Sequence, residues 1–324
     1  MPGSEIGIVV IGRNEGERLR RCIASAQGTG RHVVYVDSGS TDGSAQWAQS
    51  QGVDVVALDM AQPFTAARAR NEGVRRLREQ MPQLELVQFV DGDCELAPGW
   101  LDGARRFLAQ RTDVACVCGR LRERHPERSV YNRLCDIEWN RPVGETDACG
   151  GIAMMRADAF AQAGGFREDL IAGEEPELCL RLRAQGERVW RLADEMAWHD
   201  AAMSRFGQWW RRATRGGVAL AEGAALHGAN AQASYRARLR KTLVWGLAVP
   251  AAIVLLGLLQ PWIWAFMLVY PARIARLVPR SPDPTAGWLW AGFVVLAGFA
   301  EAFGALQYWA KRARGQGVTL IEYK

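Results

Sequence analysis

Short apolar runs alternate with amphipathic segments through residues 1–110, and this alternation constrains the fold more than any other feature. The runs are rich in valine and isoleucine, are typical of buried strands, and occupy residues 6–12, 32–37, 53–58 and 84–91. The segment after the first run carries Leu19, Cys22 and Ala26 at helical spacing. Strands that alternate with helices predict an α/β domain with a mainly parallel sheet. Ligands of such sheets bind beyond the carboxyl ends of the strands, where this chain has polar turns.

Composition changes along the 324-residue chain, which is long enough for one large domain or for two. Residues 1–240 are mixed and charged, whereas residues 243–310 hold long apolar runs with many tryptophans. The net charge is +5, and basic residues cluster just before and within the apolar tail, which favours an anionic membrane surface as a partner. There is no arginine-rich strip with interleaved aromatic residues, so no nucleic-acid partner is expected.

Seven cysteines are scattered through the chain without the spacing of a disulfide framework. Their odd number and scatter predict buried thiols in a reducing compartment. Cys116 and Cys118 form only a C-x-C, which is too little for a zinc site. The N-terminus lacks the long apolar core of a secretory signal peptide, so we expect the large domain to lie in the cytoplasm.

The fourth apolar run ends in two aspartates separated by one glycine, Asp91 and Asp93. Residues i and i+2 of an extended chain point to the same side, so these carboxylates repel each other unless a cation or several donors lie between them. Magnesium or manganese held by one or two carboxylates and by substrate phosphates is the usual solution. The alternative is a solvated turn, since Asp-Gly is a common turn dipeptide.

Two further polar groups follow apolar runs. Asp37 comes directly after the second run and suits either a ligand contact or an Asx-turn, while Asp42 or Ser44 would cap the next helix. Arg68 and Arg70 lie near the start of the third helix, where they suit a phosphate contact or a solvated basic face. The first turn, "GRNEG", is not G-x-G-x-x-G and no P-loop lysine follows it, which disfavours ordinary dinucleotide and P-loop sites.

Six strings along residues 6–200 carry a family resemblance. They are "VVIGRNEGERL", "VDSGSTDGS", "ARARNEG", "FVDGDCEL", "GGIAMMRADAFAQAGGF" and "GEEPELCLRLRAQG". In this order they resemble the family-2 inverting glycosyltransferases with the GT-A fold, of the membrane-anchored bacterial polysaccharide and glycoconjugate type. One such string is a weak signal, whereas six in order are specific.

The resemblance implies a role for each residue at the strand ends. Glu15 and Asp37 would hold the nucleotide base, and Arg70 would lie near the base or the diphosphate. Asp91 would meet the ribose or the metal. Asp93 would coordinate the metal, Mn²⁺ or Mg²⁺, that bridges the diphosphate of a sugar nucleotide.

An inverting transfer also needs a carboxylate that deprotonates the acceptor hydroxyl. Pro176 suits the first turn of a helix, and Leu178 and Leu182 give that helix a buried face. Glu175 is then expected at the N-cap, where the helix dipole favours an ionised carboxylate. The family usually has Glu-Asp here and this chain has Glu-Glu, so Glu175 is our candidate base and Glu174 the alternative on the acceptor side.

Three more residues complete the expected site. Gly150 and Gly151 resemble the family's acceptor-side glycines, where a bare backbone lets a sugar approach, although a structural turn is an equal alternative. His199, in "MAWHDAAM", is a candidate third metal ligand or diphosphate contact, against the alternative of a structural histidine.

The segment "RFGQWWRRATRGG" partly resembles the Q-x-x-R-W element of processive members, placing Gln208 and Arg211 on the acceptor side. Arg212 stands where tryptophan would be, which puts processivity in doubt. The same segment suits an amphipathic interfacial helix at about residues 203–226, because aromatic residues lie among basic ones.

The C-terminal part predicts a membrane domain at residues 233–324, after a glycosyltransferase domain at residues 1–232. Residues 242–260 are long enough to span a bilayer, and two further apolar stretches follow. Basic residues flank every stretch, so two or three crossings, or a re-entrant hairpin, remain open. Glu301 within the last stretch needs a partner or a water-filled cleft.

We therefore expect an inverting, metal-dependent glycosyltransferase with a multi-pass anchor in the inner membrane and its catalytic domain in the cytoplasm. Its donor would be a nucleotide-sugar, UDP-linked by preference, and its acceptor a lipid-linked or polyprenyl-linked glycan. One alternative is a polyprenyl-phosphate glycosyltransferase, whose ionised acceptor needs no general base. Another is an inactive sugar-nucleotide-binding scaffold of a polysaccharide synthase complex, which the acidic set argues against.

Overall fold

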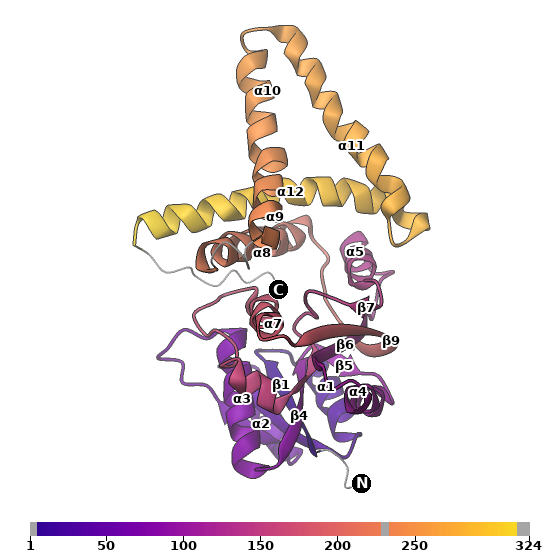
Figure 1. Ribbon diagram of the computed structural model, residues 1–324, viewed down its shortest axis with the longest axis vertical. Helices are drawn as coiled ribbons and strands as arrows, with labels where there is room; N and C mark the ends of the chain where they lie inside the picture. The colour runs from indigo at the N-terminus through magenta and orange to yellow at the C-terminus, as the bar shows by residue number, and fades with distance from the viewer. Residues whose placement is uncertain (1–4, 228–232, 316–324) are drawn as a thin grey trace. The chain divides into compact units, whose positions relative to one another are not determined.

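The computed structural model describes residues 5–227 and 233–315 and divides the chain into two compact units (Figure 1). The first unit comprises Met1–His125 and Trp139–Ala201. The second comprises Pro126–Glu138 and Ala202–Lys324.

A mixed sheet forms the centre of the first unit. Over the described part of the chain it has nine strands, in the order β3-β2-β1-β4-β8-β6-β9-β5, with β7 pairing on β9. The strands are β1 (Glu5–Gly12), β2 (His32–Asp37), β3 (Asp54–Ala57), β4 (Leu84–Asp91), β5 (Cys94–Leu96), β6 (Val114–Glu123), β7 (Gly144–Glu145), β8 (Ala153–Arg156) and β9 (Arg188–His199).

The predicted α/β fold with a mainly parallel sheet is confirmed. β3, β2, β1 and β4 run parallel, and β6 runs parallel to β9, whereas β8, β5 and β7 are antiparallel to their neighbours. The register pairs Gly12 with Asp37 and Ile11 with Asp91. The carboxyl ends of β1, β2 and β4 therefore meet at one edge of the sheet, as expected for parallel strands.

Helices cover the sheet, with α3 on one face and α1 and α4 on the other (Figure 1). Helix α1 buries Leu19, Cys22, Ile23 and Ala26, which confirms the helical spacing seen in the sequence. The helices of this unit are α1 (Glu17–Gln27), α2 (Ser44–Ser50), α3 (Ala66–Gln80), α4 (Trp100–Gln110), α6 (Ala157–Gln162) and α7 (Glu174–Ala184).

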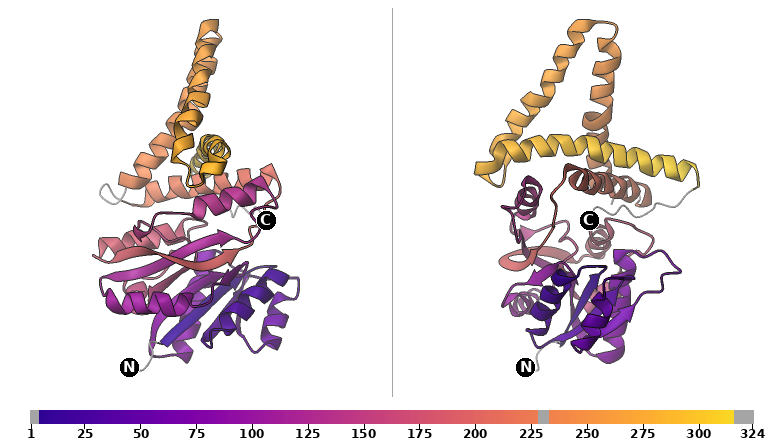
Figure 2. Two further views of the ribbon diagram at one scale, coloured as in Figure 1. Left: turned by 90° about the vertical axis from the view of Figure 1, so that its right-hand side faces the viewer. Right: turned by 180° about the vertical axis from the view of Figure 1, so that it is seen from behind.

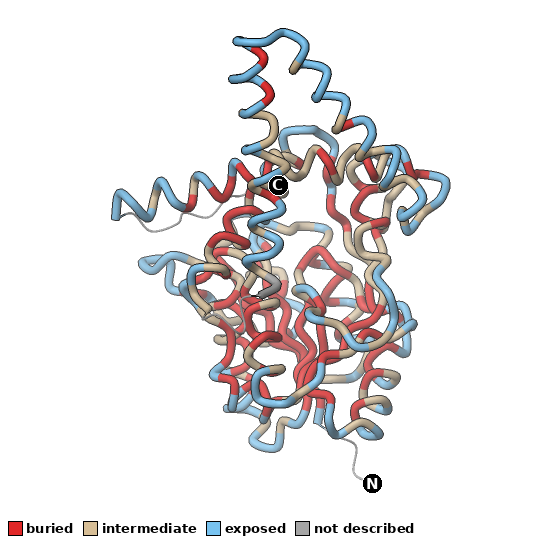
Figure 3. Tube along the Cα trace, turned by 45° about the horizontal axis from the view of Figure 1, so that its top comes forward, coloured by how far each residue is buried: buried red, intermediate tan, exposed pale blue. Residues whose placement is uncertain are grey.

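The core of the first unit lies between the sheet and these helices, where Figure 3 shows the buried residues gathered. Trp100 is buried there and donates its indole N–H to Gln88 Oε1 at 2.8 Å, so its polar group is satisfied. All seven cysteines are buried and free, as their scatter in the sequence predicts.

The second unit is helical. Helix α8 lies alongside α12, and α9 packs against both. A hairpin built from η1, α10, η2 and α11 starts there and projects away from them (Figure 2). Its elements are α5 (Val130–Trp139), α8 (Phe206–Leu226), α9 (Ala233–Leu243), the π-helical turn η1 (Val244–Ala248), α10 (Val249–Gly257), the 3₁₀ segments η2 (Pro261–Leu268), η3 (Val278–Arg280) and η4 (Pro284–Ala286), α11 (Val269–Leu277) and α12 (Gly287–Ala313). Trp139, the last residue of α5, belongs to the first unit.

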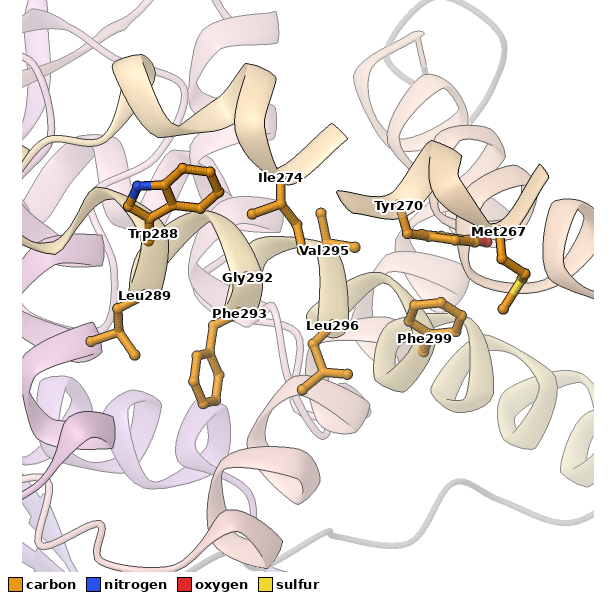
Figure 4. A pocket seen from close by; sticks show the side chains of 10 residues that line it. All are labelled: Met267, Tyr270, Ile274, Trp288, Leu289, Gly292, Phe293, Val295, Leu296 and Phe299. Carbon is orange, nitrogen blue, oxygen red and sulfur yellow. The ribbon is translucent and has the colours of Figure 1, made fainter. Parts of the chain in front are cut away.

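By length and hydropathy, two stretches of the described residues could cross a membrane, Tyr235–Gly257 and Pro284–Ala313. Only small shares of them are buried inside the molecule, 11% and 33%. The apolar stretch between them forms the 3₁₀ segment η2 and the short helix α11. Next to it, side chains from η2, α11 and α12 line an apolar cavity of about 590 Å³ (Figure 4).

Candidate active site

Asp37 closes a turn at the end of β2. Its carboxylate accepts hydrogen bonds from the Tyr35 hydroxyl at 2.8 Å and from the backbone N–H groups of Gly39 and Ser40 at 3.0 and 2.8 Å. Burial raises the pKa of Tyr35, and the Asp37 carboxylate adds to the rise, so the hydroxyl stays a donor. The Asx-turn considered from the sequence is present, and a contact of Asp37 with a nucleotide base stays a prediction.

The loops after β1 and β2 are tied together by Asn14, which adopts a positive φ of 55°. Asn14 N–H donates to Ser40 Oγ at 2.9 Å, and Asn14 Oδ1 accepts from Thr41 N–H at 2.7 Å. Asp42 adds a bond from the backbone N–H of Gly16 at 3.1 Å. Asp42 is therefore structural, but the N-cap of α2 is Gly43 and not Asp42 or Ser44, which corrects the predicted cap. The role of Asn14 was not predicted from the sequence.

Glu15 lies at the same strand ends. A Cβ placed on either Gly12 or Gly92 would stand 3.4 Å from Glu15 Cγ, so this side chain lies close to the ends of both β1 and β4. Its carboxylate pairs with Arg18 at 2.8 Å and is largely buried. The predicted role of Glu15 at the nucleotide base is compatible with this place and stays a prediction.

Arg70, on α3, joins two carboxylates that are distant in the sequence. Its Nη2 lies 2.7 Å from Asp91 Oδ1 at the end of β4, and its Nη1 lies 2.6 Å from Glu174 Oε1 at the start of α7. Arg70 is 3% exposed, whereas the Asp91 side chain is 36% exposed. The sequence analysis expected Arg70 near the donor but did not foresee the pair with Glu174.

Gly151 fits against this ion-pair network because it has no side chain. A Cβ at this position would stand 2.6 Å from Arg70 Nη2 and 3.1 Å from Asp91 Oδ2. Gly150, before it, has a positive φ of 101° that residues with a side chain rarely adopt. The structure thus explains both glycines without a ligand, Gly150 by its backbone conformation and Gly151 by the lack of space for a side chain. Their predicted approach to an acceptor sugar stays a prediction.

Helix α7 begins two residues earlier than expected, which corrects the predicted N-cap position of Glu175. Gly173 is the N-cap in a left-handed conformation, with φ of 80°, and Glu174 is the first helical residue. Glu175 is the second, still within the turn where the helix dipole favours negative charge. The predicted burial of Leu178 and Leu182 is confirmed.

Glu175 is 2% exposed and points into the protein. Its Oε1 accepts from the backbone N–H of Cys149 at 2.8 Å and from the Cys179 thiol at 2.9 Å, while its Oε2 has no hydrogen-bond partner among the described residues. Burial raises the pKa of the Glu175 carboxyl, although the bonds from Cys179, Cys149 and Gly150 oppose the rise. A raised pKa makes a carboxylate a stronger base near neutral pH.

Asp93 and His199 form a second cluster next to the turn after β4. Asp93 Oδ2 lies 3.1 Å from His199 Nε2, and Trp139 packs its ring edge-on against the imidazole at 4.7 Å between centroids. His199 Nδ1 is buried without a hydrogen-bond partner among the described residues, and Glu123 Oε2 lies 3.8 Å from it. The structure therefore brings Asp93 and His199 together, while Asp91 pairs with Arg70.

This cluster fits a hard divalent cation. Donor atoms of Asp93, Cys94 and His199 lie within 4.8 Å of one another. Burial raises the pKa of the Cys94 thiol, and Asp91 adds to the rise, which favours the protonated thiol over a thiolate while no cation is bound. A carboxylate and an imidazole remain, and carboxylates suit magnesium and manganese better than softer metals.

Two predicted acceptor-side residues belong to the second unit. Gln208 lies in the first turn of α8, where its Oε1 accepts from the backbone N–H groups of Ser204 and Arg205 at 2.9 and 3.0 Å. Arg211, one turn later, is exposed. The structure gives Gln208 a helix-capping role that the sequence analysis missed, and the acceptor roles of both residues stay predictions.

Sequence reasoning also missed Glu123 and Arg191. The β6–β9 register sets Glu123 directly beside His199, and Glu123 accepts from the backbone N–H of Ala201 at 3.1 Å. Arg191 is buried and donates to the carbonyls of Gly119 and Cys149 at 3.1 and 3.4 Å, which supports the loop before Gly150. Both strands carry other charged residues, such as Arg122 in β6 and Glu195 in β9, so the sequence offers no distinct signal for either residue.

Replacing Arg70 by methionine should destabilise the protein by about 3–5 kcal/mol, because it leaves two carboxylates without their buried partner. Urea denaturation of the detergent-solubilised protein measures this cost. Arg75→Met on the same helix is the matched control: its pairs with Glu72 and Glu79 are exposed and should be worth less than about 1 kcal/mol. An equal loss of unfolding free energy in the two variants would show that the buried pairs of Arg70 contribute no more to stability than the exposed pairs of Arg75.

Replacing Glu175 by glutamine should stabilise the protein increasingly as pH rises. A carboxyl whose folded pKa is raised contributes stability below its unfolded pKa of about 4.3 and loses it as pH rises through the folded pKa. The glutamine variant does not ionise and so avoids that loss. We expect its melting temperature to match the wild type at pH 4 and exceed it at pH 8, whereas Glu174→Gln, which weakens the Arg70 network, should be lower at pH 8. A constant offset for Glu175→Gln across this range would show that its ionisation carries no cost.

Residues 7–164 match the family model described as Glycosyl transferase family 2. Pre-mycofactocin glycosyltransferase from Mycobacterium tuberculosis is 26% identical over 201 residues, which cover 57% of this chain and 40% of that protein. O-antigen biosynthesis protein RfbC from Myxococcus xanthus is 27% identical over 233 residues, covering 62% of this chain and 18% of that protein. The chain thus spans well under half the length of these relatives.

Solved structures share the fold. A mannosyltransferase, PcManGT from Pyrobaculum calidifontis in complex with GDP-Man and Mn²⁺, superposes with a TM-score of 0.63 at 19% identity, covering 93% of this chain and 87% of that one. Residues 1–349 of TarS from S. aureus give a TM-score of 0.54 at 14% identity, covering 96% and 92%. Residues 7–164 therefore carry a glycosyl transferase family 2 domain, and the chain has a GT-A-like fold.

Proposed function

We propose that this protein is a metal-dependent inverting glycosyltransferase, which moves a sugar from a nucleotide-sugar to a lipid-linked glycan at the cytoplasmic face of a membrane. The observation that carries the proposal is the set of charged groups at the carboxyl edge of the sheet. Asp91 faces solvent beside buried Arg70, and Asp93 lies against His199. The glycosyl transferase family 2 domain supports the class of reaction.

The donor would lie across the ends of β1, β2 and β4. Asp37 and Glu15 would contact the base, and Arg70 with Asp91 would lie by the ribose or diphosphate. Asp93 and His199 would hold Mn²⁺ or Mg²⁺, which supplies positive charge that stabilises the departing diphosphate. UDP is the nucleotide expected from the sequence, and GDP is the second candidate because the structural neighbour PcManGT was solved with GDP-Man.

Glu175 is the proposed general base. In an inverting transfer the acceptor hydroxyl gives its proton to a carboxylate, its oxygen bonds to the anomeric carbon, and the bond to the diphosphate breaks. The raised pKa of Glu175 suits proton acceptance, and Glu174 would position Arg70 rather than react. Gly150 and Gly151 would border the acceptor sugar, with Gln208 and Arg211 as further candidates on that side.

The deep burial of Glu175 also favours a second candidate, a polyprenyl-phosphate glycosyltransferase. Glu175 is 2% exposed and Glu174 is already paired with Arg70, so neither carboxylate lies freely in solvent. A lipid phosphate is already ionised and needs no base to attack the donor. The two candidates share the donor site and differ in their dependence on Glu175.

Attachment to the inner membrane is part of the proposal. Two stretches are apolar enough to span, and basic residues lie at the start of the first and at the end of the second. Basic residues beside apolar helices favour an anionic cytoplasmic leaflet. A lipid-linked acceptor would then be confined to the same surface as the enzyme. The sequence leaves two or three crossings, or a re-entrant hairpin, open.

Nucleoside diphosphate should stabilise the protein only when a divalent metal is present. At a concentration 100-fold above its dissociation constant, a ligand adds about 2.7 kcal/mol. We would compare melting curves with UDP and GDP, with and without Mn²⁺, for the wild type and Asp93→Asn. The matched control is Asp113→Asn, whose exposed carboxylate pairs with Arg111 before β6. Loss of the shift in Asp93→Asn alone supports the metal site, whereas an equal shift without metal would contradict it.

Glu175→Gln should lower kcat by about 100-fold or more while leaving nucleotide binding unchanged, because general-base catalysis contributes about 10² to 10⁴. Because we expect Glu175→Gln to melt at a higher temperature than the wild type at pH 8, unfolding of the variant would not explain a lower kcat. Turnover would be followed as metal-dependent nucleoside diphosphate release with a lipid-linked glycan or a polyprenyl phosphate as acceptor. Unchanged kcat with polyprenyl phosphate would replace the first candidate by the second, and release with neither acceptor would contradict both.

A further inference from the structure

Helix α12 is long and apolar enough to cross a bilayer. Its contacts within the second unit instead favour a position along the membrane surface. It packs parallel to α8 (Figures 1 and 2). Phe293 lies 4.8 Å from Trp209 between ring centroids, and further along, a Cβ on Gly217 would stand 2.0 Å from the Glu301 carbonyl oxygen. The two backbones therefore touch, with no room for lipid between them at this point.

Helix α8 is too charged to lie in the hydrocarbon of a bilayer. It carries Arg211, Arg212 and Arg215 in its second and third turns and Glu222 two turns further on. Charged residues inside a membrane-spanning segment are rare because their transfer from water is costly. Aromatic and basic residues in the first turns of α8 instead suit the interface between headgroups and acyl chains. Because α12 lies along α8, we expect α12 to lie at the same depth, in the interface between headgroups and acyl chains.

Glu301 lies near the middle of α12, so a membrane-crossing α12 would hold this carboxylate near the bilayer centre. Its Oε2 instead accepts a hydrogen bond from Thr242 Oγ1 at 3.0 Å. Thr242 directly follows Arg240 and Lys241, where the charged part of the preceding helix ends. The middle of α12 therefore lies where the charged residues of α9 end and the apolar residues that lead into the hairpin begin. In this position Glu301 avoids the cost of a charge at the centre of the bilayer.

Both ends of α12 are also polar. Before its first turn, Arg133 of α5 pairs with Asp283 at 3.2 Å and donates to Thr285 Oγ1 at 2.7 Å. After its apolar part come Lys311, Arg312 and Arg314. A helix with charged or polar anchors at its start, middle and end matches a bilayer surface along its whole length.

The hairpin has the opposite character. Residues 242–272 contain no charged residue, and the turn at its tip exposes Leu258, Leu259 and Trp262 by 74%, 75% and 65%. Near its base the two limbs are joined by the Tyr270 hydroxyl, which donates to the Trp245 carbonyl at 2.8 Å. The charges lie outside this stretch, at Arg236, Arg238, Arg240 and Lys241 before it and Arg273, Arg276 and Arg280 after it.

An apolar cavity occupies the angle between the hairpin and α12 (Figure 4). Met267 and Ile274 line it from the hairpin side, and Trp288, Leu296 and Phe299 line it from α12. Its side chains offer hydrocarbon surface, and water would gain few hydrogen bonds there. Acyl chains of the surrounding lipid have the chemistry that fits this lining.

We propose that the hairpin is the only part of the described chain that enters the bilayer, and that α12 lies along the membrane surface without crossing it. The hairpin enters and leaves on one side, so residues 282 and 314, which flank α12, lie on the same side of the membrane. This inference rests on the membrane attachment proposed above. It excludes α12 as a crossing and, of the alternatives that the sequence leaves open, favours the re-entrant hairpin.

Labelling of single added cysteines tests the inference in the full chain. Pro282→Cys and Arg314→Cys flank α12 at exposed positions, and Gln49→Cys, exposed on α2, marks the side of the first unit. The seven native cysteines are buried and free, so their background reaction is low. A charged, membrane-impermeant maleimide is applied to right-side-out and inverted vesicles that carry each variant. Carbonate extraction first establishes that the chain stays in the membrane.

We expect all three cysteines to react in the same vesicle orientation, with at least a 10-fold preference over the other. Opposite preferences for Pro282→Cys and Arg314→Cys would show that α12 crosses the bilayer and would overturn the inference. A preference of both opposite to that of Gln49→Cys would show that the hairpin region crosses an odd number of times and would overturn it as well. Release of the chain by carbonate would instead overturn the membrane attachment, and the inference with it.

Discussion

Buried Arg70 is the interaction on which the arrangement of the candidate site depends. Its guanidinium holds Asp91, at the end of β4, and Glu174, at the start of α7, at 2.7 and 2.6 Å. Neither carboxylate can move away without leaving a buried cation short of a partner, which is costly. Gly151 lies so close to the guanidinium that a Cβ would collide with it. One side chain thus fixes the proposed donor edge and the proposed acceptor loop relative to each other.

Sequence periodicity predicts the parts of the fold that depend on local pattern. The buried residues of α1 and the strands that end at Asp37 and Asp91 follow from helical spacing and apolar runs, and parallel strand ends then bring the two aspartates to one edge. The pair of Arg70 with Glu174 spans 104 positions, and the place of Glu123 beside His199 depends on a β6–β9 register with irregularities. Such tertiary contacts leave no periodic signal in a single sequence.

Hydropathy and packing give different views of the C-terminal helices. Length and composition alone make α12 a candidate span. The contact with charged α8 and the bond of Glu301 to Thr242 depend on which elements meet, and a hydropathy average cannot contain them. A surface helix and a one-sided hairpin would hold the protein at the membrane surface, where the proposed lipid-linked acceptor would lie.

The most direct test of the proposed donor site is the position of manganese in crystals grown with a nucleoside diphosphate. Anomalous scattering measured at the manganese absorption edge locates the ion independently of the protein atoms. We expect one anomalous peak in contact with Asp93 and His199, with the diphosphate beside it and the base near Asp37. A manganese ion held elsewhere, or a nucleotide bound away from the ends of β1, β2 and β4, would contradict the account.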